Sequence, residues 1–285
     1  MQVVSSIADL RAAVGEARAG GARVGLVPTM GALHAGHVSL VERANRDAEC
    51  TVMSIFVNPL QFGPHEDLSS YPRPVEADER MAGESGVNIL FRPDVAEMYP
   101  PGRCITVSAG ELGGDWEGKS RPGHFDGVLT VVAKLFNIVQ PDFAVFGRKD
   151  LQQSALVQTL VRDLDMNLSI VLAPIVREHD GLAMSSRNRY LDVDDRRRAV
   201  VLSKALACVR RLFASGERDT ASLEAAGRRV LGSDPEIATD YFAIVNPMTF
   251  KRAKLVEAAF AAIVAARMGK TRLIDNTIVG TNDQG

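Results

Sequence analysis

The stretch Arg23–Val57, RVGLVPTMGALHAGHVSLVERANRDAECTVMSIFV, decides the fold because two apolar runs flank a helical pattern within it. The first run, Arg23–Pro28, predicts a strand, and the spacing of apolar residues across Val38–Ala48 predicts a helix. The second run, Thr51–Val57, is apolar almost throughout, which is typical of a strand buried on both faces of a parallel sheet. The stretch is therefore expected to form a strand–helix–strand unit.

The same alternation continues to about residue 175. Further strands are predicted at Val87–Phe91, Asp142–Phe146 and Leu168–Leu172, and helices at Val75–Glu84, Phe125–Val139 and Lys149–Asp163. Strands that alternate with crossover helices indicate an α/β fold with a doubly wound, Rossmann-like parallel sheet.

The pattern changes after Pro174. Two helices are predicted at Asp192–Ser215 and Thr220–Leu231, followed by strands at Tyr241–Val245, Ala258–Ala266 and Leu273–Val279. Helices followed by a run of strands indicate a smaller α+β domain. We therefore expect two domains, covering residues 1–174 and 175–285.

Composition excludes several classes of protein. The 285 residues include seven lysines, 26 arginines and 35 acidic residues, for a net charge of −2, which argues against nucleic acid as the main partner. No apolar stretch approaches the roughly 18 residues of a membrane-spanning helix. The three cysteines are widely separated and indicate neither a disulfide framework nor a zinc site. The N-terminal residues lack the pattern of a secretory signal, so a cytoplasmic location is expected.

The segment Pro28–His37, PTMGALHAGH, directly follows the first predicted strand. Gly31 and Gly36 permit a tight turn and close approach of the backbone to a ligand. A helix predicted to begin near His37 would direct its unpaired N–H groups toward the turn, at the sheet edge where α/β proteins bind ligands. His34 and His37 could then both donate to a phosphate. The alternatives are two surface histidines in a turn, one histidine that serves as a helix cap, or a metal-binding pair.

Two later segments could also bind an anion. Phe146–Gln153, FGRKDLQQ, follows a predicted strand and places Lys149 at a helix start, where its flexible charge can reach phosphate oxygens. Met184–Asn188, MSSRN, supplies two hydroxyls, backbone N–H groups and a guanidinium. Taken alone, Lys149 could be an ordinary solvated lysine at a helix start, and MSSRN could be an ordinary turn.

Gly113–Ser120, GGDWEGKS, matches the P-loop expression G-x-x-x-x-G-K-[ST]. In a P-loop the lysine and the hydroxyl residue open a helix, whereas here Pro122 and Gly123 follow almost at once and the helix is expected only near His124. We therefore predict a flexible loop at this position.

The H-x-G-H pattern resembles the HIGH signature of the nucleotidyltransferase superfamily. Together with FGRKDLQQ, MSSRN, SIFVNPLQF at Ser54–Phe62, RPGHF at Arg121–Phe125 and GKTRLIDN at Gly269–Asn276, it makes the chain resemble the pantothenate synthetase family, the AMP-forming pantoate–β-alanine ligases. The resemblance implies ATP-dependent condensation of D-pantoate with β-alanine through pantoyl adenylate. It also implies release of AMP and pyrophosphate, Mg²⁺ on the ATP phosphates, and a homodimer.

The resemblance also implies roles for individual residues. The catalytic residues would be His34, His37 and Lys149, with His37 as the proton donor. ATP would be bound by Met30, Gly31, His34, Gly36, His37, Gly147, Lys149, Asp150, Val176, Met184, Ser185, Ser186 and Arg187. The substrate would be bound by Pro28, Met30, Asn58, Gln61, Phe62 and Gln153, and no protein side chain would ligate the metal. Ala35 departs from the family, which usually has an acidic residue there.

Other functions share some of these features. Another nucleotidyltransferase would release pyrophosphate without β-alanine-dependent AMP. A regulatory module would bind ATP without turnover, although Gln61 and Gln153 favour a site for a small hydroxy acid. An aminoacyl-tRNA synthetase carries the histidine signature, but this chain is short and lacks a basic surplus.

Overall fold

The computed structural model describes residues 1–64, 66–252, 254–256 and 259–280. The chain divides into two compact units. Unit 1 comprises Met1–Arg148 and Leu156–Ala173, and unit 2 comprises Lys149–Ala155 and Pro174–Gly285. The short segment Lys149–Ala155, which the sequence pattern assigns to the first domain, thus groups with the C-terminal unit.

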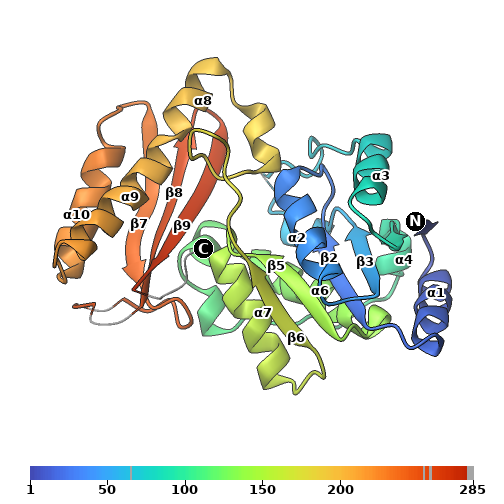
Figure 1. Ribbon diagram of the computed structural model, residues 1–285. Helices are drawn as coiled ribbons and strands as arrows, with labels where there is room; N and C mark the ends of the chain where they lie inside the picture. The colour runs from blue at the N-terminus through green and yellow to red at the C-terminus, as the bar shows by residue number, and fades with distance from the viewer. Residues whose placement is uncertain (65, 253, 257–258, 281–285) are drawn as a thin grey trace. The chain divides into compact units, whose positions relative to one another are not determined.

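Unit 1 contains a six-stranded parallel sheet with strand order β1-β4-β3-β2-β5-β6 (Figure 1). The strands are β1 (Gln2–Val4), β2 (Val24–Thr29), β3 (Cys50–Ile55), β4 (Ile89–Phe91), β5 (Phe143–Gly147) and β6 (Ser169–Ala173). From β2 the chain adds strands first on one side and then, from β5, on the other. The predicted doubly wound parallel sheet is therefore confirmed, and its switch point lies between β2 and β5.

The helices of this part of the chain vary in length from one turn to more than four. They are α1 (Ile7–Ala19), α2 (Ala35–Asn45), α3 (Val75–Glu84), α4 (Val95–Met98), α5 (Glu117–Ser120), α6 (His124–Val139) and α7 (Leu151–Asp163), with 3-10 helices η1 (Pro59–Gln61) and η2 (Glu111–Gly113). The first residues of α7 belong to unit 2 and the remainder to unit 1.

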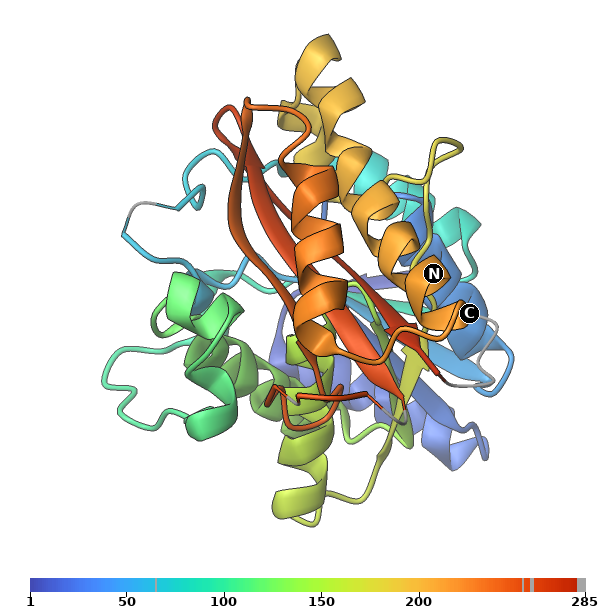
Figure 2. The ribbon, with the colours of Figure 1, turned by 90° about the vertical axis from the view of Figure 1, so that its left-hand side faces the viewer.

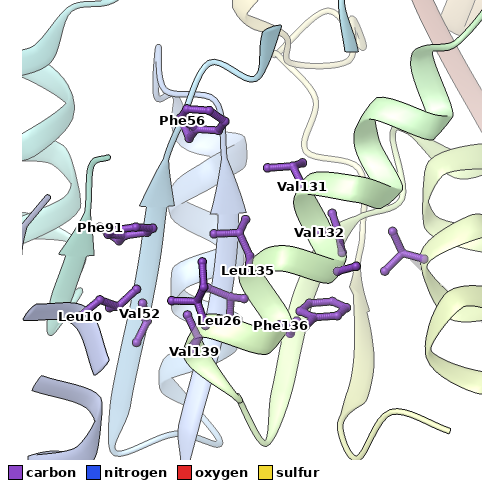
Figure 3. Close-up of a cluster of buried hydrophobic side chains, with 14 of the residues drawn as sticks. Leu10, Leu26, Val52, Phe56, Phe91, Val131, Val132, Leu135, Phe136 and Val139 are labelled. Atoms are coloured by element: carbon purple, nitrogen blue, oxygen red, sulfur yellow. The ribbon is translucent and has the colours of Figure 1, made fainter. Parts of the chain in front are cut away.

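Helices pack on both faces of the sheet, and alternate strand residues point to opposite faces, so each strand contributes to two cores. Leu26 of β2 and Val52 of β3 contribute to a core that includes α1 and α6, which Figure 3 shows in close-up. Their neighbours Val27 and Met53 contribute to a second core that includes α2 and α3. The continuous apolar run of β3 follows from this burial on both sides.

Several helices and strands within the first 173 residues differ from the prediction. β1 and α1 were not predicted. α2 begins at Ala35, two residues before the predicted start near His37, because His34 caps the helix. α7 begins at Leu151, since Lys149 and Asp150 lie in the turn before it.

The predicted loop over Gly113–Ser120 contains the end of η2 and the one-turn helix α5. Lys119 and Ser120 end the one-turn helix α5 instead of opening a helix, and α6 begins at His124 as expected. The segment follows η2 and not a strand, and a Cβ atom on Gly118 would lie 1.7 Å from the Gly113 carbonyl oxygen. This packing has none of the geometry of a P-loop.

Unit 2 contains an antiparallel sheet of β7 (Ile237–Val245), β8 (Phe260–Met268) and β9 (Thr271–Val279). Figure 2 shows its two longer helices, α9 (Val201–Ala214) and α10 (Thr220–Leu231), lying side by side on one face of this sheet. Residue Ala258, the predicted start of the second strand, lies outside the described residues. The α+β fold predicted for the C-terminal part of the chain is therefore confirmed.

One predicted helix of unit 2 is divided. The sequence predicts a single helix over Asp192–Ser215, but the structure has α8 (Val193–Ala199), α9 and, before them, the 3-10 helix η3 (Ser186–Tyr190). Val200 separates α8 from α9 while keeping helical backbone angles, which explains why the apolar spacing runs through the break. Within the part of the chain that the structure describes, no helix combines the length and the apolar character needed to cross a membrane.

Candidate active site

The turn after β2 is held at its start by Thr29. The Thr29 hydroxyl donates to the Ser54 carbonyl at the end of β3, at 2.7 Å, and accepts from the Gly31 N–H at 3.2 Å. Gly31 has φ +83°, a left-handed conformation that glycine adopts without strain. This backbone conformation explains why a glycine occurs in the turn that follows β2.

Asp78 of α3 fixes the middle of the same turn. Its carboxylate oxygens accept the backbone N–H groups of Ala32 and Leu33, each at 2.8 Å, and the residue is 3% exposed. Two N–H groups directed at one carboxylate also hold Ala32 at φ +50°. Sequence reasoning missed Asp78, because an acidic residue in the first turn of a helix is an ordinary feature.

His34 and His37 cap α2 reciprocally. His34 Nδ1 accepts from the Gly36 N–H at 3.1 Å, and His37 Nδ1 accepts from the His34 N–H at 3.3 Å. The two ring centroids are 4.1 Å apart. Because Nδ1 is the acceptor on both rings, each neutral imidazole carries its proton on Nε2. The arrangement therefore gives both rings an Nε2–H donor at the N-terminus of a helix.

Asn58 and Gln61 form a buried amide pair at η1. Asn58 Nδ2 donates to Gln61 Oε1 at 2.9 Å and to the Gly127 carbonyl of α6 at 3.0 Å. Asn58 Oδ1 accepts from the Tyr99 hydroxyl at 2.8 Å. With its oxygen held by Asn58, Gln61 directs its Nε2 toward the Met30 sulfur, 3.1 Å away.

The backbone of Gln61 is held by the RPGHF segment. Its carbonyl accepts from His124 Nδ1 at 2.8 Å and from Arg121 at 3.3 Å, and Arg121 also pairs with Glu66. Burial, reinforced by the adjacent Arg121 charge, lowers the pKa of His124 to about 4. His124 is therefore neutral at pH 7, with Nδ1 as donor and Nε2 accepting from Arg121 at 3.0 Å.

Close packing sets the position of η1 against α6. A Cβ atom on Gly127 would lie 2.3 Å from the Leu60 carbonyl oxygen. Only glycine at this helix position allows the backbone of η1 to approach so closely. The predicted substrate residues Asn58 and Gln61 are thereby fixed to the long central helix of unit 1.

The structure brings some of the predicted site residues of unit 1 together. Met30 contacts Gln61, and Phe62 packs edge-on against Tyr71 with ring centroids 5.8 Å apart. Pro28 pairs in register with Ser54 within the sheet. Gly147 is the last residue of β5, the strand beside β2. Gly147 and the histidine turn therefore lie at the carboxyl ends of neighbouring strands, at the switch point.

Predicted site residues of unit 2 lie on two segments. Lys149, Asp150 and Gln153 belong to the segment Lys149–Ala155. The Lys149 carbonyl accepts from Asn276 Nδ2 of β9 at 2.8 Å, a contact that sequence reasoning did not predict.

The second segment folds back on itself. The Met184 N–H donates to the Val176 carbonyl at 3.0 Å, so these two predicted ATP-binding residues face each other across a turn. Ser185 then caps η3 by accepting from the Arg187 N–H at 3.3 Å, and Ser186 is the first residue of that helix. The SSRN pattern is therefore a capped helix start.

We searched the described residues for side chains that could together hold a metal ion. Over residues 1–64, 66–252, 254–256 and 259–280, no group of three or more His, Cys, Asp or Glu side chains is placed to hold a metal ion. His34 and His37 form a pair only, and each uses Nδ1 in the cap.

Comparison with known proteins gives consistent matches over nearly the full length. The family model described as pantoate–β-alanine ligase matches residues 2–278. The chain is 50% identical to a pantothenate synthetase of Acidobacterium capsulatum, over 98% of this chain and 97% of that relative. It is 47% identical to a pantothenate synthetase of Pelotomaculum thermopropionicum, over 98% and 99% of the two chains.

Solved structures match equally well. The pantothenate synthetase from Thermus thermophilus superposes with a TM-score of 0.93 at 48% identity, covering 97% of this chain and 99% of that one. The pantoate–β-alanine ligase from Francisella tularensis, complexed with beta-gamma ATP and β-alanine, gives a TM-score of 0.81 at 31% identity over 99% of both chains. Sequence and fold together show that this chain belongs to the pantoate–β-alanine ligase family and is a ligase of pantothenate biosynthesis.

Proposed function

We propose that this ligase uses ATP to condense D-pantoate with β-alanine through a pantoyl-adenylate intermediate, releasing pyrophosphate and AMP. The observation that carries the proposal is the reciprocal cap of His34 and His37, which presents two Nε2–H donors where β2 leads into α2. This sheet edge, at the switch point, is where doubly wound proteins bind nucleotides. The relative from Francisella tularensis, complexed with beta-gamma ATP and β-alanine, supports two of these substrates, ATP and β-alanine.

The proposed chemistry needs charge stabilisation more than proton abstraction. A pantoate carboxylate oxygen attacks the α-phosphorus of ATP, and the bond from that phosphorus to the bridging oxygen of pyrophosphate breaks. The amine of β-alanine then attacks the acyl carbon, AMP leaves with its carboxylate-derived oxygen, and the amine loses a proton. Because a carboxylate is ionised at pH 7, the first step calls for donors and cations that hold two anions together.

The chain supplies donors and cations of this kind. In the proposal, His34, His37 and Lys149 contact the phosphates, with His37 donating its proton to them. Gly147 and Asp150 contact the ribose, and Val176 contacts the adenine through its backbone. The remaining ATP contacts are Met30, Gly31, Gly36, Met184, Ser185, Ser186 and Arg187. Because Asp78 accepts the N–H groups of Ala32 and Leu33, the turn that carries His34 and His37 would be arranged before ATP binds.

Pantoate would be held by amides and an apolar wall. Gln61 and Gln153 would bind its hydroxyls and carboxylate, with Asn58 holding Gln61 in place at 2.9 Å. Pro28, Met30 and Phe62 would contact its two methyl groups. The Gln61 oxygen is bonded to Asn58 and one N–H is directed at the Met30 sulfur, so its second N–H would be the donor to pantoate, a substrate rich in acceptors.

Other parts of the proposal rest on the family resemblance. Mg²⁺ would arrive on the ATP phosphates. The C-terminal domain would close as part of a lid that protects the acyl adenylate from water. A homodimer and a cytoplasmic location also remain predictions.

A complete reaction mixture tests the proposal. The purified protein is incubated with ATP, Mg²⁺, D-pantoate and β-alanine, and AMP and pantothenate are measured. We expect both products in equal amounts, and pantoate-dependent pyrophosphate exchange when β-alanine is omitted. Pyrophosphate release without β-alanine-dependent AMP would indicate another nucleotidyltransferase instead. ATP binding without any product, by correctly folded protein, would indicate a regulatory module.

A further inference from the structure

Two consecutive residues of β9 are polar and buried on opposite faces of the sheet. Asp275 pairs in register with Val264, which packs in the core under α9 and α10, whereas Asn276 pairs with Ile263 on the other face. Both polar residues are 3% exposed. A buried amide or carboxylate must be hydrogen-bonded to be tolerated, so the partners of these two side chains indicate what they hold.

Asn276 holds the backbone of Lys149. Its Nδ2 donates to the Lys149 carbonyl at 2.8 Å, across 127 positions of sequence but within unit 2. The backbone of Asn276 is itself fixed, because its N–H donates to Asp275 Oδ1 at 2.7 Å and its carbonyl accepts from Arg177 at 3.2 Å. Asp275 and Arg177 therefore hold the backbone that carries the Asn276 amide.

Asp275 holds a second segment through Arg177. The guanidinium donates to both carboxylate oxygens, at 2.7 and 3.0 Å, and to the Gly181 carbonyl at 3.0 Å. Burial raises the pKa of Asp275, and the paired Arg177 and the charge of Lys149 act in the opposite direction. Arg177 follows Val176 directly, so β9 fixes the start of the turn that brings Val176 to Met184.

We infer that Asn276 is a positioning residue for ATP binding, which sets the backbone from which the Lys149 side chain reaches the phosphates. This inference rests on the proposed function, in which Lys149 contacts those phosphates. A lysine side chain is long and flexible, so its ammonium group reaches one site efficiently only if its backbone is fixed. Asn276 fixes that backbone without contacting the nucleotide.

A double-mutant cycle tests the inference. Dissociation constants for α,β-methylene ATP with Mg²⁺ are measured for the wild type, Asn276→Ala, Lys149→Ala and the double variant. We expect Asn276→Ala to weaken binding about tenfold, consistent with loss of a buried hydrogen bond. In the Lys149→Ala background, the same substitution should have no further effect, because there is no ammonium group left to position.

Two further variants separate positioning from general damage to unit 2. Asn276→Asp is isosteric but directs an acceptor at the Lys149 carbonyl, so it should weaken binding at least as much as alanine. Asn246→Ala removes two structural hydrogen bonds, to the N–H groups of Met248 and Thr249, and should leave binding unchanged.

The outcomes are distinguishable. If Lys149→Ala itself leaves binding unchanged, the proposed role of Lys149 is wrong. If Lys149→Ala weakens binding but Asn276→Ala does not, or if Asn276→Ala has the same effect in both backgrounds, Asn276 is not a positioning residue.

Discussion

A Cβ atom on Gly31 would lie 2.9 Å from Oδ2 of Asp78, the oxygen that accepts the Ala32 N–H. The carboxylate of α3 and the backbone of the histidine turn are therefore in direct contact. Any side chain at position 31 would have to displace the group that fixes the turn.

The variant Gly31→Ala should consequently be destabilised and inactive. Alanine at φ +83° is strained, and its Cβ would push against Asp78, so we expect a loss of about 1–3 kcal/mol in the free energy of unfolding. Urea unfolding and pantoate-dependent pyrophosphate exchange measure the two effects. The control is Gly15→Ala in α1, where among the described residues nothing lies within 4 Å of the added Cβ. That variant should gain up to about 1 kcal/mol.

Substitutions of His34 should separate its capping role from its chemical role. Asparagine is a good N-cap residue and alanine is a poor one, so His34→Ala should be about 1 kcal/mol less stable than His34→Asn. Both variants lack the imidazole and should lose most of the exchange activity. The pair is compared by thermal unfolding and exchange assay; full activity in His34→Asn would show that the histidine serves only as a cap.

Two lysines provide a matched comparison for the phosphate site. Lys149→Ala should lower pyrophosphate exchange by several orders of magnitude while the fold survives, because a cation on the phosphates is lost. Lys119→Ala, at the end of α5, should leave turnover nearly intact. Circular dichroism verifies the fold of both variants. A collapse of activity in Lys119→Ala would restore the P-loop interpretation, and normal exchange in Lys149→Ala would contradict its proposed role.

Acidification should destabilise the protein through His124. Its pKa falls from 6.5 to about 4 on folding, so between these values the unfolded chain binds more protons than the native one. The free energy of unfolding should therefore fall as the pH is lowered from about 6.5 to about 4, by about 3 kcal/mol in all. Denaturation at several pH values measures the slope. His124→Asn cannot titrate, and an identical slope in that variant would assign the effect to other groups.

The sheet was predictable because its burial on both faces leaves a local pattern. β3 and β5 are mostly apolar along their whole length. Most residues of α6 are apolar and buried. β1 was missed because it has three residues and only Val4 is buried. A short edge strand is specified by pairing with β4, and nothing in its own sequence records that pairing.

In the candidate site, the sequence marks only those contacts whose residues are close to each other along the chain. The histidine pair meets this condition because the reciprocal cap operates across three positions. Asp78 and Asn276 do not, since each holds a backbone group that is 45 or more positions away. Their partners are main-chain atoms, which every residue type supplies, so no second side chain marks the contact in the sequence.

The contact between Gly127 and Leu60 limits how the substrate range of this enzyme could be altered. In saturation mutagenesis, position 127 should tolerate glycine alone, because even a methyl group would lie 2.3 Å from the Leu60 carbonyl oxygen. Libraries aimed at longer or bulkier hydroxy acids would therefore gain nothing from α6 at this point. If pantoate binds as proposed, variation would have to come from Met30 and Phe62, whose side chains are only partly buried.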